Sequence, residues 1–574
     1  MKEKKPTGYP SIDKPWLKYY SEEAINAPLP ECTIYEYLWE SNKDHLDDVA
    51  LIYFGRKITY GQLFKNIETT AKAFSVLGIK EGDIVTICSV TTPEIIYAFY
   101  ALNRLGAVSN MVDPRTSTEG IKHYIEEVNS KLVITIDVAL PKIEKAIVGT
   151  KAEKIISVSP YNSLPTVKKI IVNALGQLRG NSIKLPANGI SWNKFIGGSV
   201  EPRYATYKKN TCCVIVHTGG TTGTPKGVML SNDNLNCVAI NCQYCDSNYE
   251  RNKIFLNFMP PFLAYGIVNG LHMIFAQGMT NVIIPNMREG ELPKLINKYQ
   301  PTHFLGAPNH YMSLIETNAL KPNSLKKLCI AGIGADTLNS NLEKEINEYL
   351  YRYGYKVGLM KGYGMTEVSA AATGNNYKTN KIGSVGIPFV KNIMSAFNPD
   401  TNEECKYNER GEICINTPTK MLGYYNMTEE TNMVIKKHAD GSKWVHSGDI
   451  GYVDEDGVFF IEGRVKRMII RFDGFKVFPA QIENIILKSN IISNCSTVGV
   501  TDRTKAHGML PIVFVVLKTD INKQKAKKDL FELCKAELPE YAQPIDFIFI
   551  DELPLTPIGK VDYRKLEEIA NTFN

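Results

Sequence analysis

The sequence predicts an α/β protein with more than one domain. Residues 51–136 alternate short β-rich runs such as "DIVTICSV" with helical ones such as "PEIIYAFYALNRLGAV", and the alternation recurs over residues 214–357. Strands that alternate with helices favour parallel sheets. The chain has 574 residues, which exceeds what one hydrophobic core usually supports, so at least two domains are expected.

The pattern changes towards the C-terminus, which places a domain boundary there. After "CKYNERGEICINT" come short strands and turns, "GYVDEDGVFFIEGRVKRMIIRFDG", and then a compact βαβ pattern. A boundary near residues 463–466 leaves about 110 residues, a normal size for a small domain. We therefore expect a large domain over residues 1–463 and a small one over residues 464–574. No repeat of fixed period is present.

Composition excludes several classes of protein. A hydrophobic content of 44% and a charged content of 22% are ordinary for a soluble globular protein. A net charge of +6 is too dilute over this length to indicate a nucleic-acid partner. The first residues, "MKEKKP", lack the apolar core of a secretory signal. The twelve scattered cysteines are therefore expected to be reduced thiols of a cytoplasmic protein.

Two segments each allow two interpretations. Residues 254–287 contain no Asp, Glu, Lys or Arg, which is long enough for a membrane span; the prolines, glycines and His272 inside them favour a strand, a turn and a buried helix instead. Cys237, Cys242 and Cys245 match three ligands of an iron–sulfur site. The segment after Ser231 favours a capped helix, so core thiols are the preferred interpretation.

Residues 167–178 form an amphipathic stripe. Apolar side chains recur there at helical spacing, and Lys168, Lys169 and Arg179 add positive charge. Such a helix can lie on a membrane surface. Packing on the protein's own surface is the commoner outcome, and both alternatives stay open.

A loop suited to phosphate follows a predicted strand. "CCVIV" at residues 212–216 is a short buried run, and "HTGGTTGTPKG" at residues 217–227 comes directly after it. Glycines let backbone N–H groups approach an anion, threonine hydroxyls add donors and Lys226 adds a charge, so a phosphate chain is the expected ligand. Lys226 stands between Pro225 and Gly227 rather than before Ser or Thr, which excludes a Walker site.

Three later motifs carry further polar groups. In "GYGMTE", Tyr363 can stack on a base, Thr366 can bind a phosphate and Glu367 can hold Mg²⁺. In "WVHSGDIG" we expect Asp449 in a tight turn, where a carboxylate can accept ribose hydroxyls. "LPLTPIGKVD" presents Lys560 from a loop rich in proline and glycine.

Taken in order, these motifs resemble the adenylate-forming superfamily, which includes acyl-CoA synthetases, luciferases and the adenylation domains of peptide synthetases. The resemblance rests on "HTGGTTGTPKG", "GYGMTE", "GEICI", "WVHSGDIGY", "EGRVKRMIIRFDGFKVFPAQIE" and "LPLTPIGKVD", and it covers roughly residues 51–566. It implies a large N-terminal domain of mixed and parallel sheets wrapped by helices, and a small mobile C-terminal α+β domain that acts as a lid.

The resemblance also implies roles for individual residues. The phosphate loop would hold ATP through Thr218, Gly219, Gly220, Thr221, Thr222, Gly223 and Lys226. Gly334, Ala335 and Asp336 would line one wall of the adenine site, and Gly362, Tyr363 and Gly364 the other. Thr366 would contact the α-phosphate and Glu367 the metal ion, while Asp449 and Arg464 would hold the ribose. Lys560 would bridge the carboxylate and the α-phosphate, Lys466 would be the hinge, and Gly474 would approach coenzyme A.

The expected reaction has two steps. A carboxylate attacks the α-phosphorus of ATP with Mg²⁺, pyrophosphate leaves, and a thiol then displaces AMP from the acyl-adenylate. We expect coenzyme A as the thiol; an acyl carrier protein is the alternative acceptor. A luciferase-type oxygenase and an adenylate-binding module without catalysis are alternatives from other classes, and a monomer and a homodimer are both open.

The expected acid is hydrophobic. Relatives that activate α-amino acids place an aspartate after a phenylalanine in the motif that here is "PPFLAYG", and an ammonium facing Leu263 and Ala264 would be costly. Many acyl- and aryl-CoA synthetases carry a histidine where this chain has Leu263, a departure that bears on the usual aromatic gate. Phe262, Tyr265, Gly266 and Gly332 are the predicted acyl-pocket residues.

Overall fold

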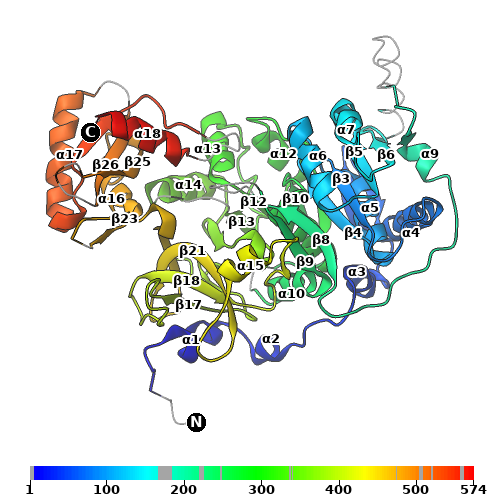
Figure 1. Cartoon of the computed structure of the whole chain (residues 1–574), viewed down its shortest axis with the longest axis horizontal. Helices are drawn as coiled ribbons and strands as arrows, with labels where there is room; N and C mark the ends of the chain where they lie inside the picture. Colours follow the sequence, from blue (N-terminus) through cyan, green and yellow to red (C-terminus); the bar gives the residue numbers. More distant parts are fainter. Residues whose placement is uncertain are drawn as a thin grey trace.

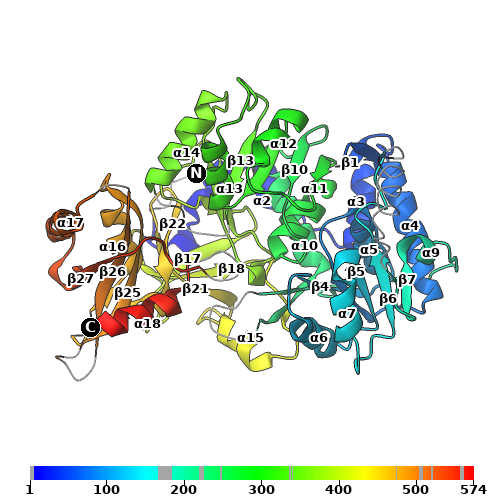
Figure 2. The ribbon, with the colours of Figure 1, turned by 90° about the horizontal axis from the view of Figure 1, so that it is seen from above.

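A computed structural model describes residues 5–165, 168, 184–218, 225–245, 248–334, 338, 340–473, 475–502, 504, 508–518, 521–555 and 561–573. Two units are visible in both views: a large one that runs from the N-terminus to the yellow strands, and a small orange and red one at the C-terminal end (Figures 1 and 2). The large unit contains mixed, mostly parallel sheets wrapped by helices. The predicted α/β fold class is confirmed.

An eight-stranded sheet lies at one end of the large unit, with strand order β19-β9-β8-β4-β3-β5-β6-β7. Its central pairs are parallel, and β9 runs antiparallel to β8 and β19. The strands are β3 (Ile84–Cys88), β4 (Val108–Val112), β5 (Leu132–Ile136), β6 (Lys154–Val158), β7 (Gly189–Ser191), β8 (Cys212–His217), β9 (Gly227–Ser231) and β19 (Gly423–Tyr424).

A nine-stranded sheet follows, with order β16-β15-β14-β13-β12-β10-β11-β1-β2. It is parallel from β14 to β1 and antiparallel at both edges. Its strands are β1 (Val49–Tyr53), β2 (Arg56–Thr59), β10 (Ile254–Asn257), β11 (Thr280–Ile283), β12 (His303–Gly306), β13 (Ile330–Ile333), β14 (Met360–Tyr363), β15 (Thr373–Gly374) and β16 (Ile387–Pro388).

Helices cover both faces of these two sheets, so the large unit is layered. One apolar core joins α6 and α7 to the outer face of the eight-stranded sheet, and another joins α12, α13 and α14 to the outer face of the nine-stranded sheet. Helices α3, α4, α5, α10 and α11 contribute to the core that the two sheets share, whereas α1 and α15 contact strands of a third sheet. The helices of the large unit are α1 (Pro10–Asp13), α2 (Glu22–Asn26), α3 (Ile34–Asn42), α4 (Tyr60–Val76), α5 (Pro93–Arg104), α6 (Thr118–Glu127), α7 (Leu140–Ala146), α9 (Trp192–Phe195), α10 (Asn232–Gln243), α11 (Met273–Ala276), α12 (Leu292–Tyr299), α13 (Pro308–Thr317), α14 (Ser340–Arg352) and α15 (Thr428–Val434).

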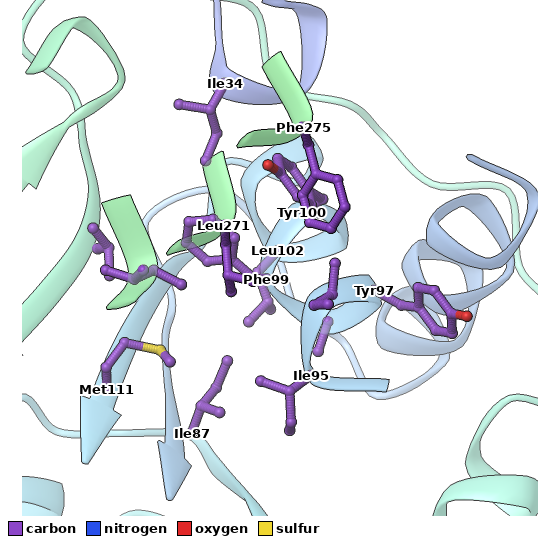
Figure 3. Close-up of a cluster of buried hydrophobic side chains, with 14 of the residues drawn as sticks. Ile34, Ile87, Ile95, Tyr97, Phe99, Tyr100, Leu102, Met111, Leu271 and Phe275 are labelled. Atoms are coloured by element: carbon purple, nitrogen blue, oxygen red, sulfur yellow. The ribbon is translucent and has the colours of Figure 1, made fainter. Parts of the chain in front are cut away.

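Helix α5 lies at the centre of the core between the sheets. Almost all of its side chains are buried, because it packs on β3 and β4 on one side and on α3 and α11 on the other. Figure 3 shows Ile95, Phe99 and Tyr100 of α5 among Met111 of β4 and Phe275 of α11. Burying a large apolar side chain contributes roughly 1.5–3 kcal/mol, so this cluster is a main source of cohesion between the two sheets.

The charge-free segment 254–287 is part of this core. It forms strand β10, a π-helical turn η3 (Tyr265–His272), α11 and strand β11, as the prolines and glycines predict. His272 is buried there and is held by the Tyr100 hydroxyl at 3.2 Å and by Asn236 at 2.9 Å. Among the described residues, none of the helices has the length and apolar character that crossing a membrane requires.

The cysteines of segment 237–245 are core thiols, which is the interpretation that the sequence favoured over an iron–sulfur site. Cys237 and Cys242 are buried on α10, whose N-terminus Ser231 caps with a capping box. The group of three candidate metal ligands found among the described residues lies elsewhere, at Cys414, His438 and His446.

A third sheet joins the large unit to the small one. It has order β17-β18-β21-β20, with β22 paired to β21. Its strands are β17 (Ile393–Phe397), β18 (Gly411–Asn416), β20 (Ile435–Lys437), β21 (Lys443–Val453) and β22 (Phe459–Arg464).

The small unit contains the compact βαβ pattern expected from the sequence. Strands β25 and β26 are antiparallel, and α17 connects β26 to β27 in parallel. Its elements are η5 (Val465–Arg467), β23 (Ile469–Ile470), β24 (Lys476–Val477), α16 (Pro479–Ile486), β25 (Ile492–Thr501), β26 (Met509–Leu517), α17 (Lys523–Glu537), β27 (Asp546–Phe549) and α18 (Tyr563–Phe573).

Candidate active site

The phosphate loop connects two paired strands, β8 and β9. At its base, the Thr218 backbone N–H donates to the Lys226 carbonyl at 3.0 Å, and the Lys226 N–H donates to Thr218 Oγ1 at 3.4 Å. The two ends of the loop, at Thr218 and Lys226, are therefore held together beside the paired strands β8 and β9. Five of its predicted ligands, Gly219, Gly220, Thr221, Thr222 and Gly223, lie outside the described residues.

Lys226 is connected to the predicted metal carboxylate through an aromatic ring. Its Nζ lies 4.7 Å from the centre of the Tyr424 ring, and the Tyr424 hydroxyl donates to Glu367 Oε1 at 2.7 Å. Burial raises the pKa of Tyr424 well above its ordinary value, so the phenol stays protonated and remains a donor. The structure thus brings the phosphate loop and the "GYGMTE" motif together across 141 residues of sequence (367 minus 226).

Glu367 fits a Mg²⁺ site. It is 8% exposed and lies in a single 3-10 turn, η4 (Thr366–Val368), at the end of β14. Carboxylate oxygens are the ligands that Mg²⁺ prefers, together with substrate phosphates, and the Lys226 ammonium adjoins this carboxylate through Tyr424. Thr366 precedes Glu367 in the same turn, so both predicted groups leave the strand at one place.

The backbone around this turn is unusually constrained. A Cβ on Gly364 would lie 1.9 Å from the Ala370 carbonyl oxygen, so only glycine fits there. Ser369 and Ala370 have φ of 57° and 77°, conformations that are costly for residues other than glycine. Such strain is concentrated at functional sites and shows that the turn is held by its surroundings.

Gly334 and Gly362 lie next to each other at the ends of parallel strands β13 and β14. A Cβ on Gly334 would meet the Gly362 carbonyl at 3.6 Å and the Tyr265 hydroxyl at 3.7 Å. The structure therefore places a predicted acyl-pocket residue beside the predicted adenine site. Ala335 and Asp336 lie outside the described residues.

Asp449 is in an extended strand, so the predicted tight turn is wrong. It lies inside the eleven-residue strand β21 and is paired with Arg464 of β22. The preceding Gly448 has φ +70°, and the register shifts between Ile450 and Gly451. The Ser-Gly-Asp sequence, typical of a turn, here bends a paired strand, because backbone pairing on both sides keeps the chain extended.

The two residues expected to hold the ribose, Asp449 and Arg464, are in contact, and Tyr363 also contacts Asp449. Arg464 Nε lies 2.7 Å from Asp449 Oδ1, and the Tyr363 hydroxyl donates to Asp449 Oδ2 at 2.5 Å. Burial raises the pKa of Tyr363 well above its ordinary value, and the Asp449 carboxylate adds to this effect. The carboxylate that would accept ribose hydroxyls is thus held at both oxygens.

Of the predicted acyl-pocket residues, Tyr265 lies beside Gly334 of the predicted adenine site. Tyr265 begins η3, and a Cβ on the following Gly266 would lie 1.8 Å from the Pro260 carbonyl oxygen, so glycine is required. Phe262 is buried, with the Arg115 guanidinium 5.6 Å from its ring centre. Gly332 faces Leu305, which a Cβ would approach to 2.2 Å. Leu263, in contrast, is 41% exposed.

Lys466 lies in an exposed 3-10 turn between β22 and the small unit. The next residue, Arg467, belongs to the small unit: its Nη2 donates to Glu483 Oε1 at 2.9 Å and to the Thr497 carbonyl at 3.2 Å. Its guanidinium also lies 3.6 Å from the ring centre of Tyr563. The turn therefore connects strand β22 with Arg467, a residue whose contacts lie in the small unit. Lys560 and Gly474 lie outside the described residues.

His217, immediately before the phosphate loop, is buried and neutral. Burial lowers its pKa to about 3, and its Nε2–H donates to Asn110 Oδ1 at 2.8 Å. It therefore adds no positive charge beside the predicted phosphate loop, where Lys226 is the predicted cation.

Sequence reasoning missed Tyr424 and Ser447. Tyr424 is in "LGYY", which has no pattern that indicates a contact with Lys226 or Glu367. Ser447 Oγ accepts from the Asp449 N–H at 3.0 Å and donates to the Ile413 carbonyl at 2.6 Å. Its place two residues before Asp449 is a weak signal for such a support.

The structure thus brings Lys226 together with Glu367 through Tyr424, and Asp449 together with Arg464 and Tyr363, as expected for groups of one nucleotide site. Comparison with known proteins agrees. Residues 38–425 match the model of the AMP-binding enzyme family, and residues 481–560 match that of the AMP-binding enzyme C-terminal domain. The chain belongs to the AMP-binding enzyme family, and the predicted resemblance is confirmed.

Curated relatives align over nearly the whole chain. A long-chain-fatty-acid–CoA ligase of Bacillus subtilis (strain 168) is 28% identical over 97% of this chain and 98% of its own length. A probable 4-coumarate–CoA ligase 2 of Dictyostelium discoideum is 30% identical over 96% of this chain and 98% of its own. These relatives are CoA ligases, and the predicted enzyme class, an ATP-dependent AMP-forming ligase, is confirmed.

Solved structures share the fold. The anthranilate CoA ligase AuaEII in complex with anthranoyl-AMP has a TM-score of 0.78 at 20% identity, covering 96% of this chain and 99% of that one. ATP-bound MatB from Rhodopseudomonas palustris has a TM-score of 0.79 at 20% identity, covering 94% and 99%. At this identity the likeness shows the fold, including the small C-terminal unit.

Proposed function

We propose that this protein joins a hydrophobic carboxylic acid to coenzyme A, with ATP and Mg²⁺, through an acyl-adenylate. The observation that carries the proposal is the convergence of Lys226, Glu367 and Asp449 through the two tyrosines Tyr424 and Tyr363. These contacts support a common site in which the three motifs would hold the phosphates, the metal ion and the ribose. The CoA ligases among the relatives favour coenzyme A over an acyl carrier protein as acceptor.

The first step, formation of the acyl-adenylate, needs positive charge where the carboxylate of the acid meets the α-phosphate of ATP. Lys226 and the hydroxyl and N–H groups of the phosphate loop would hold the β- and γ-phosphates. A Mg²⁺ ion on Glu367 would neutralise charge on the phosphates, and Thr366 would donate to the α-phosphate. Asp449, held by Arg464 and Tyr363, would position the ribose. Lys560 would place its ammonium between the carboxylate and the α-phosphate, where fixed charge lowers the barrier.

The second step needs a change of geometry between two bodies. We propose that residues 1–463 and 464–574 are these bodies and that Lys466 is the hinge. The exposed turn at Lys466 and the anchoring of Arg467 on Glu483 and Tyr563 support this division. Rotation would withdraw Lys560 and bring the loop at Gly474 to the thiol entrance.

The acid is proposed to be hydrophobic because the segment after Phe262 offers no partner for an ammonium group. Leu263 and Ala264 occupy the positions after that ring, and Tyr265 lies beside Gly334 of the predicted adenine site. The acids in the names of the relatives, a long-chain fatty acid in one and 4-coumarate in another, agree with an apolar acyl group.

The test is product analysis by mass spectrometry. The enzyme is incubated with ATP, Mg²⁺ and CoA and a panel of fatty, aryl, steroid and amino acids. We expect AMP and a CoA thioester with one hydrophobic class and neither product with amino acids. Acyl-AMP without thioester would move the proposal to a carrier protein as acceptor, and absence of AMP with every acid would contradict it.

Peripheral membrane contact is a separate proposal for residues 167–178. Those residues lie outside the described ones except Lys168, whose Nζ donates to the Phe54 carbonyl at 3.0 Å. Phe54 and Tyr161, next to this segment, are exposed apolar side chains, which suits an interfacial location. Flotation with anionic liposomes, compared between the full chain and a variant with Ile170 and Ile171 changed to Gln, tests it; equal flotation of the two would contradict it.

A further inference from the structure

A cluster of soft and borderline metal ligands lies in the third sheet, away from the phosphate loop. Cys414 of β18 is the cross-strand partner of His446 of β21, and His438 follows β20, the strand on the other side of β21. Three neighbouring strands thus contribute one candidate ligand each. Among the described residues this is the one such group with three ligand atoms within 4.8 Å of one another.

One ligand atom of each of the three residues lies within 4.8 Å of those of the other two. His438 Nε2 lies 3.0 Å from His446 Nε2, and Cys414 Sγ lies 3.5 Å from His446 Nδ1, on the other side of the ring. A thiolate at ~2.3 Å and an imidazole nitrogen at ~2.0 Å from one zinc ion lie roughly 3.5 Å apart in a tetrahedron. Cys414 Sγ therefore has to turn towards the Nε2 side of His446 for one ion to bind all three residues.

A carboxylate holds the central histidine in the form that binds metal. His446 Nδ1 donates to Glu412 Oε2 at 2.8 Å, and the other oxygen, Oε1, accepts from the Gly448 N–H at 2.9 Å. Because a carboxylate only accepts, the proton is on Nδ1 and the lone pair is on Nε2, facing His438. A carboxylate that orients a histidine in this way is typical of zinc sites.

The surroundings are dry, and the Cys414 thiol donates a long hydrogen bond to the Glu412 carbonyl at 3.7 Å. Cys414 is fully buried, His446 is 7% exposed and His438 9% exposed. Trp444 stacks on the His438 ring, and Phe397 packs against both rings.

We propose that Cys414, His438 and His446 form a site for a borderline divalent transition metal ion, Zn²⁺, with Glu412 as the residue that positions His446. On binding, the Cys414 thiol proton passes to solvent and Sγ bonds to the ion. The hard Mg²⁺ ion that accompanies ATP prefers oxygen ligands and would not occupy this site.

The location gives the site a structural role beside the nucleotide. Glu412 contacts the backbone of Gly448, and the next residue is Asp449. An ion that links β18, β20 and β21 would therefore brace the bent strand that presents the ribose carboxylate. The proposal does not depend on which acid the enzyme activates.

Cobalt titration of the full chain, without nucleotide and with thiols reduced, tests the proposal. We expect one equivalent of Co²⁺ to give a sulfur-to-cobalt charge-transfer band and the visible bands of four-coordinate cobalt, and Zn²⁺ to abolish both. Cys414→Ser should lose the charge-transfer band, His438→Gln should lose binding, and Glu412→Gln should weaken it about 10–100-fold.

Cys405→Ser is the matched control. Cys405 is also buried beside this sheet, with its Sγ 3.6 Å from the Arg410 carbonyl, and this variant should titrate like the unmodified protein. Thermal melting provides a second readout: Zn²⁺ should raise the Tm of the unmodified protein and leave that of His438→Gln unchanged. Absence of a charge-transfer band in the unmodified protein, or its persistence in Cys414→Ser, would overturn the proposal.

Discussion

At the scale of single residues, Tyr424 is where two motifs meet. Its ring faces the Lys226 ammonium and its hydroxyl donates to Glu367. A cation over an aromatic ring is worth about 0.5–2 kcal/mol, and a hydrogen bond to a charged group about 1.5–3 kcal/mol. One side chain therefore contacts both the proposed phosphate-binding lysine and the proposed metal carboxylate.

Tyr424→Phe should keep the ring under Lys226 and remove the donor to Glu367. Partners of a metal ligand typically affect affinity by 10–100-fold, so we expect the Mg²⁺ concentration for half-maximal adenylation to rise about 10-fold. Tyr425→Phe, at the neighbouring position, is the control and should behave like the unmodified enzyme. An unchanged Mg²⁺ dependence of Tyr424→Phe, measured by pyrophosphate release, would refute this role.

Gly364→Ala should destabilise the fold. Its Cβ would meet the Ala370 carbonyl oxygen at 1.9 Å, whereas a Cβ on Gly334 has only ordinary contacts at 3.6 Å and beyond. Forced overpacking typically costs 1–3 kcal/mol, so we expect Gly364→Ala to lower the urea midpoint clearly and Gly334→Ala to change it little. Equal midpoints for the two variants would contradict the structural account of this turn.

The motifs that supply the proposed site residues could be recognised in the sequence, but the contacts of these residues could not. Thr218, Lys226, Glu367, Asp449 and Arg464 belong to recognisable motifs, and the contacts among the described residues bring these motifs together. Tyr424 was not predicted because a tyrosine after glycine carries no signal for its partner Glu367, which is 57 residues away in the sequence (424 minus 367). Such contacts come from tertiary packing, which local sequence does not encode.

At the scale of elements, strand β21 carries three residues to which this account gives a role. They are His446 of the proposed zinc site, Ser447, which supports the backbone, and Asp449, the proposed ribose ligand. The sequence predicted a tight turn here because Gly and Ser favour turns. Cross-strand pairing with β18 and β22 overrides that preference, whereas β3, β8 and α5, whose patterns are apolar and regular, form as predicted.

The turn η5 is the element on which the two-body proposal depends. Proline at position 466 would restrict φ in this exposed turn. We expect Lys466→Pro to spare acyl-AMP formation and to slow thioester formation, while Lys466→Ala retains both. Separate assays of the two half-reactions decide it, and loss of adenylation in Lys466→Pro would show that the turn serves the first step instead.

At the scale of the whole molecule, two large sheets share one core and the active-site motifs lie along their edges. The order of motifs in sequence follows β8–β9, then β14, then β21–β22, so the site forms only when both sheets and the third sheet are assembled. Alternation of strands and helices predicted the parallel sheets. The arrangement of the sheets relative to one another depends on buried contacts such as those of α5, which no local pattern specifies.

The small unit is proposed to supply Lys560 to the first step only. We expect Lys560→Ala to slow adenylate formation by at least ~10²-fold, because it removes fixed charge at the transferring group. Thioester formation from supplied acyl-AMP should stay largely intact. Equal losses in the two half-reactions would contradict the assignment, and Lys565→Ala on α18 is a control that should retain both.

The most direct test of the account is acid-dependent exchange between labelled pyrophosphate and ATP, without coenzyme A. This exchange requires reversible acyl-AMP formation at the site built from Lys226, Glu367 and Asp449. We predict exchange that depends on both Mg²⁺ and a hydrophobic acid and that falls by at least ~10²-fold in Lys560→Ala. Exchange that is absent with every acid, or that proceeds without any acid, would contradict adenylation as the chemistry of this protein.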